Sequence, residues 1–305
     1  MSERTVHVSV PGTSANCGPG FDTLGVACTI YNEMDISLLN ENRLEITAEG
    51  EGAEYIAPDS RNIVWRAIDL VLQKAGKGNE YKGAVIKMKN NVPLSRGLGS
   101  SAAAIVAGIK AANYLLDEPF NRRQLLKLAT DMEGHPDNVA PALFGGFTVS
   151  IMRNGQPECF SFLPRIKLKM VVAIPDFPLS TRAARSVLPA TVPLQDAVNN
   201  VGRSSMMVAA LMKGNIRFLR HTFEDALHQP YRARLIPGMY DVFRAAKKEG
   251  AIGASLSGAG PCLIAYTVDN PIGIGEAMKT VFKDHDIESR IAVLEVDRHG
   301  ATIVE

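Results

Sequence analysis

Hydrophobic and polar residues alternate along several short stretches of the chain, and such alternation predicts half-buried β-strands. The first stretch, residues 6–10, alternates three valines with His7 and Ser9, and this strand is expected to end at the turn-forming pair Pro11-Gly12. Further strands are expected over residues 34–39, 43–49, 81–90, 145–152, 170–174, 251–255, 262–268 and 290–296.

Between these stretches, apolar residues recur every three or four positions, which predicts helices. Residues 62–74 place six apolar side chains on one face, and Gly76 is suited to end that helix. Asn121 is a typical N-cap for a helix that runs to about residue 132. Other helices are expected in an alanine-rich run up to Tyr114, several times between 193 and 248, and over 273–283.

Strands and helices are therefore mixed in the manner of an α+β protein. The composition shifts around residues 154–169, and we expect one domain over residues 1–160 and a second over residues 161–305. A chain of 305 residues is long enough for two such domains and a sizeable core.

Charge and cysteine content narrow the class of protein. The formal net charge is +1, which gives no reason to expect a nucleic-acid partner. We see no apolar run long enough to cross a membrane and no signal-peptide core. The four cysteines lack the C-x-x-C spacing of zinc sites and do not indicate a disulfide framework. A small-molecule enzyme of the reducing cytoplasm fits this profile.

The most informative segment is a glycine- and serine-rich loop between a predicted strand and a predicted helix, Pro93-Leu94-Ser95-Arg96-Gly97-Leu98-Gly99-Ser100-Ser101-Ala102-Ala103. Glycines let the backbone approach a ligand closely, and the free N–H groups of a helix start favour an anion, most often phosphate. The segment is not a P-loop, because G-x-x-x-x-G-K-[ST] does not occur in the chain. Taken alone, it could also be a loop followed by an ordinary N-cap.

Two other glycine-bearing segments follow predicted strands or helices. Residues 11–25 carry two side chains with strong directional hydrogen-bonding capacity, Asn16 and Asp22. Residues 253–261 read Gly-Ala-Ser-Leu-Ser-Gly-Ala-Gly-Pro between a helix and a strand. Taken alone, the first could be a wide turn held by its own polar side chains, and the second a glycine-rich hairpin.

Together, these three segments resemble the signature motifs of the GHMP kinase family, in the same order along the whole chain: P-x-x-x-N, P-x-x-x-G-L-G-S-S-A-A and S-G-A-G-P. The resemblance implies a two-domain fold, with a ribosomal protein S5 domain 2-like N-terminal domain that carries the ATP phosphate loop and a ferredoxin-like C-terminal domain. ATP is then expected between the two halves.

Within the family, the chain is most similar to the branch that phosphorylates L-homoserine. The similarity lies in residues 15–22, 135–146, 180–189 and 230–238. It implies direct in-line transfer of the γ-phosphoryl group of ATP to the side-chain hydroxyl of L-homoserine, which gives O-phospho-L-homoserine for threonine biosynthesis. Homodimers are common in the family, and neither a nucleic-acid nor a membrane partner is expected.

The residue types agree with an amino-acid acceptor. Forked guanidinium groups suit a carboxylate, and acidic side chains suit an ammonium or hydroxyl group. The resemblance implies that the substrate is bound by Asn16, Asp22, His135, Asp137, Asn138, Thr181, Arg185 and Arg232. Of these, Asn16 and Asp22 are also expected to act in catalysis, together with Glu133. Each side chain alone could instead be an ion pair, a solvated charge or a satisfied loop residue.

The nucleotide and metal assignments also come from the resemblance. The ATP-binding residues are expected to be Asn62, Pro93, Leu94, Ser95, Arg96, Gly97, Leu98, Gly99, Ser100, Ser101, Ala102, Ala103, Ser257, Gly258 and Gly260. Ser101 and Glu133 are expected to hold Mg²⁺, which prefers few protein oxygens and bridges phosphates. Asn62 could equally be only the N-cap of its helix.

Three other functions remain open at this stage. A kinase of the same family for another alcohol is the nearest, and the segments around Asn16, Asp137 and Arg232 argue against it. A diphosphomevalonate decarboxylase shares the fold, but its polyanionic substrate calls for more basic side chains near the first motif. A non-catalytic binding module is the third, and the intact central motif with Glu133 argues against it.

Overall fold

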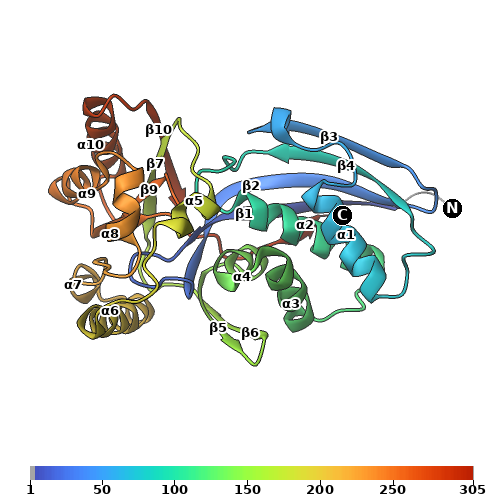
Figure 1. Cartoon of the computed structure of the whole chain (residues 1–305), viewed down its shortest axis with the longest axis horizontal. Coiled ribbons are helices and arrows are strands. Elements are labelled where there is room, and N and C mark those ends of the chain that lie inside the picture. Colours follow the sequence, from blue (N-terminus) through green and yellow to red (C-terminus); the bar gives the residue numbers. More distant parts are fainter. Residues whose placement is uncertain (1–3, 305) are drawn as a thin grey trace.

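The computed structural model describes residues 4–304, and its elements form two halves that lie side by side (Figure 1). The first half is built on a seven-stranded sheet with the order β11–β1–β2–β4–β3, which a β5–β6 hairpin joins through the start of β2. Its strands are β1 (Thr5–Ala15), β2 (Leu24–Leu39), β3 (Leu44–Gly50), β4 (Gly83–Asn90), β5 (Phe147–Arg153), β6 (Gln156–Phe162) and β11 (Thr302–Val304).

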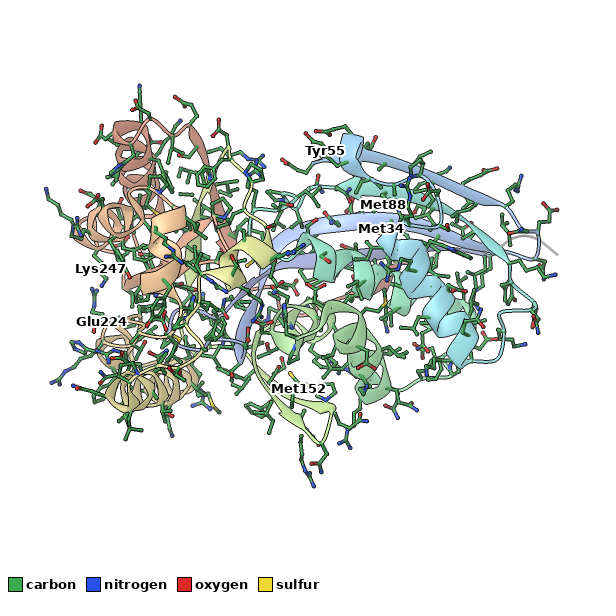
Figure 2. All side chains as sticks on the ribbon, in the orientation of Figure 1. Met34, Tyr55, Met88, Met152, Glu224 and Lys247 are labelled. Carbon is green, nitrogen blue, oxygen red and sulfur yellow. The ribbon has the colours of Figure 1, made fainter. Side chains whose placement is uncertain are left out.

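Four helices cover one face of this sheet: α1 (Ile63–Lys74), α2 (Ser100–Leu115), α3 (Arg122–Glu133) and α4 (Pro136–Phe144). The alternating strands turn their apolar side chains toward these helices. Met34 of β2 and Met88 of β4, for example, are directly opposite each other in the sheet and belong to the same core (Figure 2). Helix α2 is apolar nearly all round and is buried at the centre of this half, as expected for such a sequence.

The second half contains a four-stranded antiparallel sheet with the order β10–β7–β9–β8. Its strands are β7 (Lys169–Pro175), β8 (Gly253–Leu256), β9 (Leu263–Thr267) and β10 (Ser289–Glu295), and its two crossing helices are α9 (Met239–Lys248) and α10 (Pro271–Asp284). A helix thus follows the first strand and another follows the third, with the fourth strand beside the first. This is the βαββαβ arrangement of ferredoxin-like domains.

The remaining helices lie between β7 and α9 in the chain: α5 (Thr181–Ser186), α6 (Leu194–Lys213), α7 (Ile216–Leu219) and α8 (Gln229–Arg232), with short 3₁₀ turns at Ala53–Tyr55 and Ala233–Leu235. Helix α5 lies at the junction of the two halves (Figure 1). A shared core joins the halves, because buried residues from the start of β2 pack with residues of β7, β9 and α6. Among residues 4–304, no helix is both long and apolar enough to cross a membrane.

Several element predictions are confirmed, and the boundaries of two strands are wrong. Helix α3 follows its N-cap Asn121 as expected, with a capping box completed by Gln124. Strand β1, however, does not end at Pro11-Gly12. It continues to Ala15 through an irregularity in the pairing with β2 at that position, where a proline is tolerated. Strand β2 begins at Leu24 rather than at residue 34.

The chain also crosses the expected domain division. Strand β6 extends to Phe162 while still pairing with β5, and the last strand, β11, returns to pair with β1. The C-terminal segment therefore contributes to the first sheet. The boundary at residue 160 stays a prediction.

Candidate active site

The three glycine-bearing segments meet at the junction of the two halves. Backbone hydrogen bonds connect them: Thr13 N–H to the Leu98 carbonyl, Gly258 N–H to the Ala15 carbonyl, and Cys262 N–H to the Arg96 carbonyl. They border a cavity of about 230 Å³. Its lining includes the predicted residues Asn16, Asp22, Pro93, Leu94, Ser95, Arg96, Gly97, Gly99, Ser100, Ser101, Glu133, His135, Asp137, Asn138, Thr181, Arg185, Arg232, Gly258 and Gly260.

The central loop has the backbone that its glycines predict. Gly97 and Gly99 both adopt positive φ angles, 81° and 70°, and Gly99 is the N-cap of α2. A side chain at either position would collide with a neighbouring loop. A Cβ on Gly97 would lie 2.2 Å from the carbonyl oxygen of Ser257, and one on Gly99 would lie 2.0 Å from Oγ1 of Thr13. The loop is thus closed tightly against both other segments.

The start of α2 faces an acidic side chain. The hydroxyl group of Ser101 donates to Oε2 of Glu133 at 2.9 Å, and both residues line the cavity. Glu133 is the last residue of α3, and it forms no ion pair within residues 4–304. Burial raises the pKa of the Glu133 carboxyl group above its usual value. A carboxyl group and a hydroxyl group are therefore held side by side at the loop.

Elsewhere in the lining of the cavity, Asp22 and Arg185 form a bidentate ion pair. Nη1 of Arg185 donates to Oδ2 of Asp22 at 3.1 Å, and Nη2 donates to Oδ1 at 2.7 Å. This hydrogen bond is the main cause of the raised pKa of Arg185. Both side chains are slightly more than one-third exposed, so they can exchange partners with a ligand. The two residues that were expected to bind opposite ends of an amino acid thus neutralise each other in this structure.

Arg232 also lines the cavity, and it is only 2% exposed. Its Nε donates to the carbonyl of Ala184 at 3.1 Å, and its Nη1 donates to the carbonyl of Gly258 at 3.0 Å. No carboxylate of residues 4–304 forms an ion pair with it. Burial, with a smaller contribution from Arg185, lowers the pKa of Arg232 to about 10, so the group stays charged at neutral pH.

Other residues that were predicted to bind the substrate line the same cavity as Arg185 and Arg232. Asn16 adopts a left-handed backbone, and its side chain accepts from Asp22 N–H and donates to the Gly258 carbonyl. Asp137 lies buried in the first turn of α4 and bonds to Nδ1 of His135 at 2.5 Å. That contact is the main cause of the raised pKa of His135. Asn138 accepts from Thr13.

Five of the expected ligand-binding residues do not line this cavity: Asn62, Leu98, Ala102, Ala103 and Ser257. Asn62 caps α1 through Val64 N–H and Trp65 N–H and donates to the Ala57 carbonyl, so its side chain is engaged in the fold. Leu98 and the two alanines are buried in the core. Their contacts with a nucleotide stay predictions.

Arg96 and Ser257 connect the segments to each other. Arg96 donates from Nε to the Pro175 carbonyl and from Nη2 to the Asp176 carbonyl, so it holds the loop to the end of β7. Ser257 is buried and donates to the Gly97 carbonyl at 2.7 Å. Whether Arg96 also binds phosphate stays a prediction.

Two residues of the site were not expected from the sequence. Phe21 contacts both guanidinium groups, with its ring centroid 5.6 Å from Cζ of Arg185 and 5.2 Å from Cζ of Arg232. His228 stacks on the same ring at 5.1 Å and contacts Arg232. The spacing of four residues between His228 and Arg232 is the signal that could have revealed this pair.

Comparison with known proteins identifies the family of the chain. The GHMP kinases N terminal domain model matches residues 62–146, and the GHMP kinases C terminal model matches residues 207–284. A homoserine kinase of Carboxydothermus hydrogenoformans is 45% identical over 296 residues, which cover 97% of this chain and 96% of that protein. A homoserine kinase of Moorella thermoacetica is 42% identical, with 97% and 99% covered.

A crystal structure of homoserine kinase from Cytophaga hutchinsonii superposes with a TM-score of 0.90 at 31% identity, and it covers 100% of this chain and 98% of the other. The chain therefore belongs to the GHMP kinase family. The three relatives named here, each matched over nearly its full length, are homoserine kinases. The two-domain α+β fold expected from the sequence is confirmed.

Proposed function

We propose that this protein is an ATP-dependent homoserine kinase, which converts L-homoserine and ATP into O-phospho-L-homoserine and ADP in threonine biosynthesis. The observation that carries the substrate assignment is the state of Arg232. A buried cation without an ion-pair partner within residues 4–304 lines the same cavity as a phosphate-type loop. Burying a charge without a partner is costly, and a ligand carboxylate supplies the partner.

The acceptor is bound by the charges that face Phe21. Arg232 and Arg185 receive the carboxylate of homoserine, while Asp22 binds the ammonium group. In this view the Asp22–Arg185 ion pair is exchanged for two ion pairs with the zwitterion. The side-chain hydroxyl of homoserine is then directed toward Asn16 and the central loop, where His135, Asp137, Asn138 and Thr181 complete the lining.

The triphosphate of ATP is bound by the central loop. Its backbone N–H groups at the start of α2 are not used by the helix itself, and the partial positive charge of the helix start favours phosphate. The cavity also includes Gly258 and Gly260 of the third segment, so the phosphate chain lies between the two halves. Positive φ angles at Gly97 and Gly99 allow the backbone to approach the phosphates closely.

The donor set at Ser101 and Glu133 fits Mg²⁺. Both groups supply oxygen, the ligand type that Mg²⁺ prefers, and Glu133 has no cationic partner within residues 4–304. Bound there with ATP, Mg²⁺ would neutralise charge on the phosphates. The hydroxyl of Ser101 and the carboxylate of Glu133 are the protein groups that would hold it.

The transfer itself needs positioning more than covalent chemistry by the protein. The hydroxyl oxygen of homoserine attacks the γ-phosphorus, the bond to the β,γ-bridging oxygen breaks, and the hydroxyl proton is released. The transition state spreads charge over the γ-phosphoryl oxygens, which the loop N–H groups stabilise by hydrogen bonds. The arginines and Asp22 hold the acceptor in line for the attack. We assign the catalytic roles among the side chains to Asn16, Asp22 and Glu133.

The test is ADP release by the purified protein with Mg·ATP and a panel of acceptors: L-homoserine, mevalonate, galactose, shikimate or none. Turnover that depends on L-homoserine, with O-phospho-L-homoserine identified by mass spectrometry, is the expected result. Turnover with another alcohol would retain the kinase and overturn the acceptor assignment. ATP binding without turnover on any acceptor would overturn the enzymatic proposal itself.

A further inference from the structure

We propose that His228 is a positioning residue, which holds the guanidinium group of Arg232 in the orientation that binds the substrate carboxylate. The proposal rests on the proposed function only for the identity of that anion. His228 itself is completely buried and does not line the cavity, so it acts through Arg232 rather than on the substrate.

The contact between the two side chains follows from the local fold. His228 is the N-cap residue of the short helix α8, and Arg232 is its last residue, so they stand four positions apart on one side of the helix. Nη1 of Arg232 lies 3.2 Å from Nδ1 of His228. Both side chains are buried, which makes a hydrogen bond between them stronger than it would be in water.

The hydrogen bonds determine which tautomer His228 adopts. A guanidinium group only donates, so Nδ1 must accept from Arg232. The carbonyl oxygen of Gly18 only accepts, and it lies 2.8 Å from Nε2, so Nε2 carries the proton. The imidazole is therefore neutral, and burial lowers the pKa of His228 in agreement. The charged groups around it are Asp225, Arg232 and Asp22.

The imidazole is fixed from two further sides. The buried carboxylate of Asp225 accepts from the backbone N–H groups of His228 and Gln229 and from the amide of Asn200, which fixes the start of α8. Oδ2 of Asp225 lies 3.4 Å from Nε2 of His228. On its face, the imidazole stacks on Phe21. A ring held in this way can impose an orientation on a guanidinium group.

These contacts fix the orientation of the Arg232 guanidinium group. The acceptors at Ala184, Gly258 and His228 engage its Nε and Nη1 atoms. Nη2 of Arg232 has no hydrogen-bond acceptor within residues 4–304. Because a guanidinium group is planar, fixing Nε and Nη1 also fixes where Nη2 points. Without the imidazole acceptor, the group loses one of its three anchors.

Two near-isosteric substitutions separate the two functions of the imidazole. Asn places an acceptor oxygen where Nδ1 stands, so His228→Asn can keep the bond to Arg232. Gln reaches the place of Nε2, so His228→Gln can keep the bond to Gly18 but loses the acceptor for Arg232. We expect His228→Gln to raise the KM for homoserine roughly tenfold to a hundredfold, the equivalent of a hydrogen bond to a charged group. His228→Asn should raise it clearly less, and neither should change the KM for ATP.

A merely structural role would act differently, and two further measurements detect it. If His228 acts through Arg232, then His228→Gln should have no further effect on KM in an Arg232→Ala background, whereas an independent structural effect would be additive. His228→Gln should also leave unchanged the turnover of the amino alcohol that corresponds to homoserine without its carboxylate. Thermal unfolding of each variant monitors the fold.

The outcomes distinguish this proposal from the proposed function. Failure of the wild-type protein to turn over homoserine would reject the function, and binding of homoserine by calorimetry would then replace KM as the readout. Turnover by the wild type, with equal effects of Asn and Gln or with an additive double variant, would overturn the positioning role of His228 and leave the kinase assignment intact.

Discussion

Single charged residues in the cavity differ in how far they are already neutralised. Arg185 is bonded to Asp22 through both nitrogens and is more than one-third exposed, whereas Arg232 is almost completely buried and has no ion-pair partner within residues 4–304. Solvent and a direct ion pair therefore compensate for the charge of Arg185, whereas within residues 4–304 carboxylates act on Arg232 only from beyond ion-pair distance. The two arginines should not contribute equally to substrate binding.

The prediction is that Arg232→Ala weakens homoserine binding more than Arg185→Ala does. Removing a buried charge contact costs about 2–5 kcal/mol, so KM should rise at least about thirtyfold for Arg232→Ala. For Arg185, which is slightly more than one-third exposed, we expect about 1 kcal/mol or less, equivalent to at most a roughly fivefold rise in KM, because solvent screens its contact. Steady-state kinetics with varied homoserine measure both. Arg234→Ala is the matched control, since Arg234 is exposed and outside the cavity. An equal effect of the two cavity variants would contradict the argument.

We expect the substitution Glu133→Gln to raise the stability of the protein but to lower its activity. Burial raises its pKa, so at neutral pH the folded protein holds an ionised carboxylate at a cost that the unfolded chain does not have. Without Mg²⁺, Glu133→Gln should therefore raise the melting temperature near pH 8. As the pH falls through the raised pKa, the folded carboxyl group takes up its proton and the advantage of Gln disappears.

The same substitution should nearly abolish phosphoryl transfer, since the carboxylate is a proposed ligand of Mg²⁺. Thermal unfolding in Mg²⁺-free buffer at about pH 8 and about pH 4, on either side of the ordinary range for a glutamate, measures the first effect. ADP release against Mg²⁺ concentration measures the second. Glu158→Gln is the control, because Glu158 is paired with Arg123 at the surface. A variant that loses stability at pH 8 would show that the ionised form is favoured by the fold.

The element that decides phosphate binding is the loop between β4 and α2. Its glycines are needed for two separate reasons, the positive φ angle and the lack of space for a Cβ. These reasons can be tested separately, because Gly76 shares the first without the second. Gly76 has a φ of 70° at the end of α1, and a Cβ there would meet nothing within 4 Å.

We expect Gly76→Ala to lose about 1–2 kcal/mol, the backbone strain of a non-glycine residue in the left-handed region, and Gly97→Ala to lose more, because its Cβ also collides with the Ser257 carbonyl. Only Gly97→Ala should also lose ATP affinity, because its Cβ forces the loop away from the Ser257 carbonyl. Binding of a fluorescent ATP analogue and thermal unfolding, measured on both variants, give the comparison. If Gly97→Ala binds ATP like the wild type, the loop is not the phosphate site.

At the level of elements, periodicity predicted most helices and strands, and the misses have physical reasons. The start of β2, from Leu24 to Thr29, is buried on both faces for most of its length, so its sequence lacks the alternation of a half-exposed strand. Helix α4 contains Pro136 and Pro141, which look like loop residues. Pro136 is suited to the first helical position, and the packed core tolerates the hydrogen bond lost at Pro141. Strand β11 is too short for any pattern.

In the whole molecule, the motifs predicted which segments meet but not which side-chain contacts hold them together. Asn16, Asp22 and Arg185 were expected near each other because each belongs to a recognisable segment. The pairing of Asp22 with Arg185, and the buried support of Arg232 by His228, depend on packing between segments distant in the chain. Such contacts leave no mark in local periodicity. The sequence could therefore indicate the chemistry of the site, but not how its charged side chains pair with one another.

The three segments that form the site come from distant parts of the chain, and one buried hydroxyl group connects all of them. Oγ of Ser257, in the third segment, donates to the Gly97 carbonyl of the second at 2.7 Å and forms a hydrogen bond of 2.8 Å with the hydroxyl of Ser14 in the first. Ser257 and Ser14 are both completely buried. Removing the hydroxyl of Ser257 takes this partner from the buried hydroxyl of Ser14 and from the partly buried carbonyl of Gly97, which costs about 1–3 kcal/mol.

Ser257→Ala should therefore lower the melting temperature and raise the KM for both ATP and homoserine, since the segment that it fastens borders both parts of the cavity. A loss confined to one substrate would mean that Ser257 contacts that ligand rather than the loops. Thr130→Val is the control for removal of a buried hydroxyl, because Oγ1 of Thr130 has no hydrogen-bond partner within residues 4–304. That control should be neutral or stabilising, since no buried group loses a partner. An unchanged melting temperature and unchanged KM values of Ser257→Ala would place the connection between the two halves elsewhere, in the core that β2 shares with the second sheet.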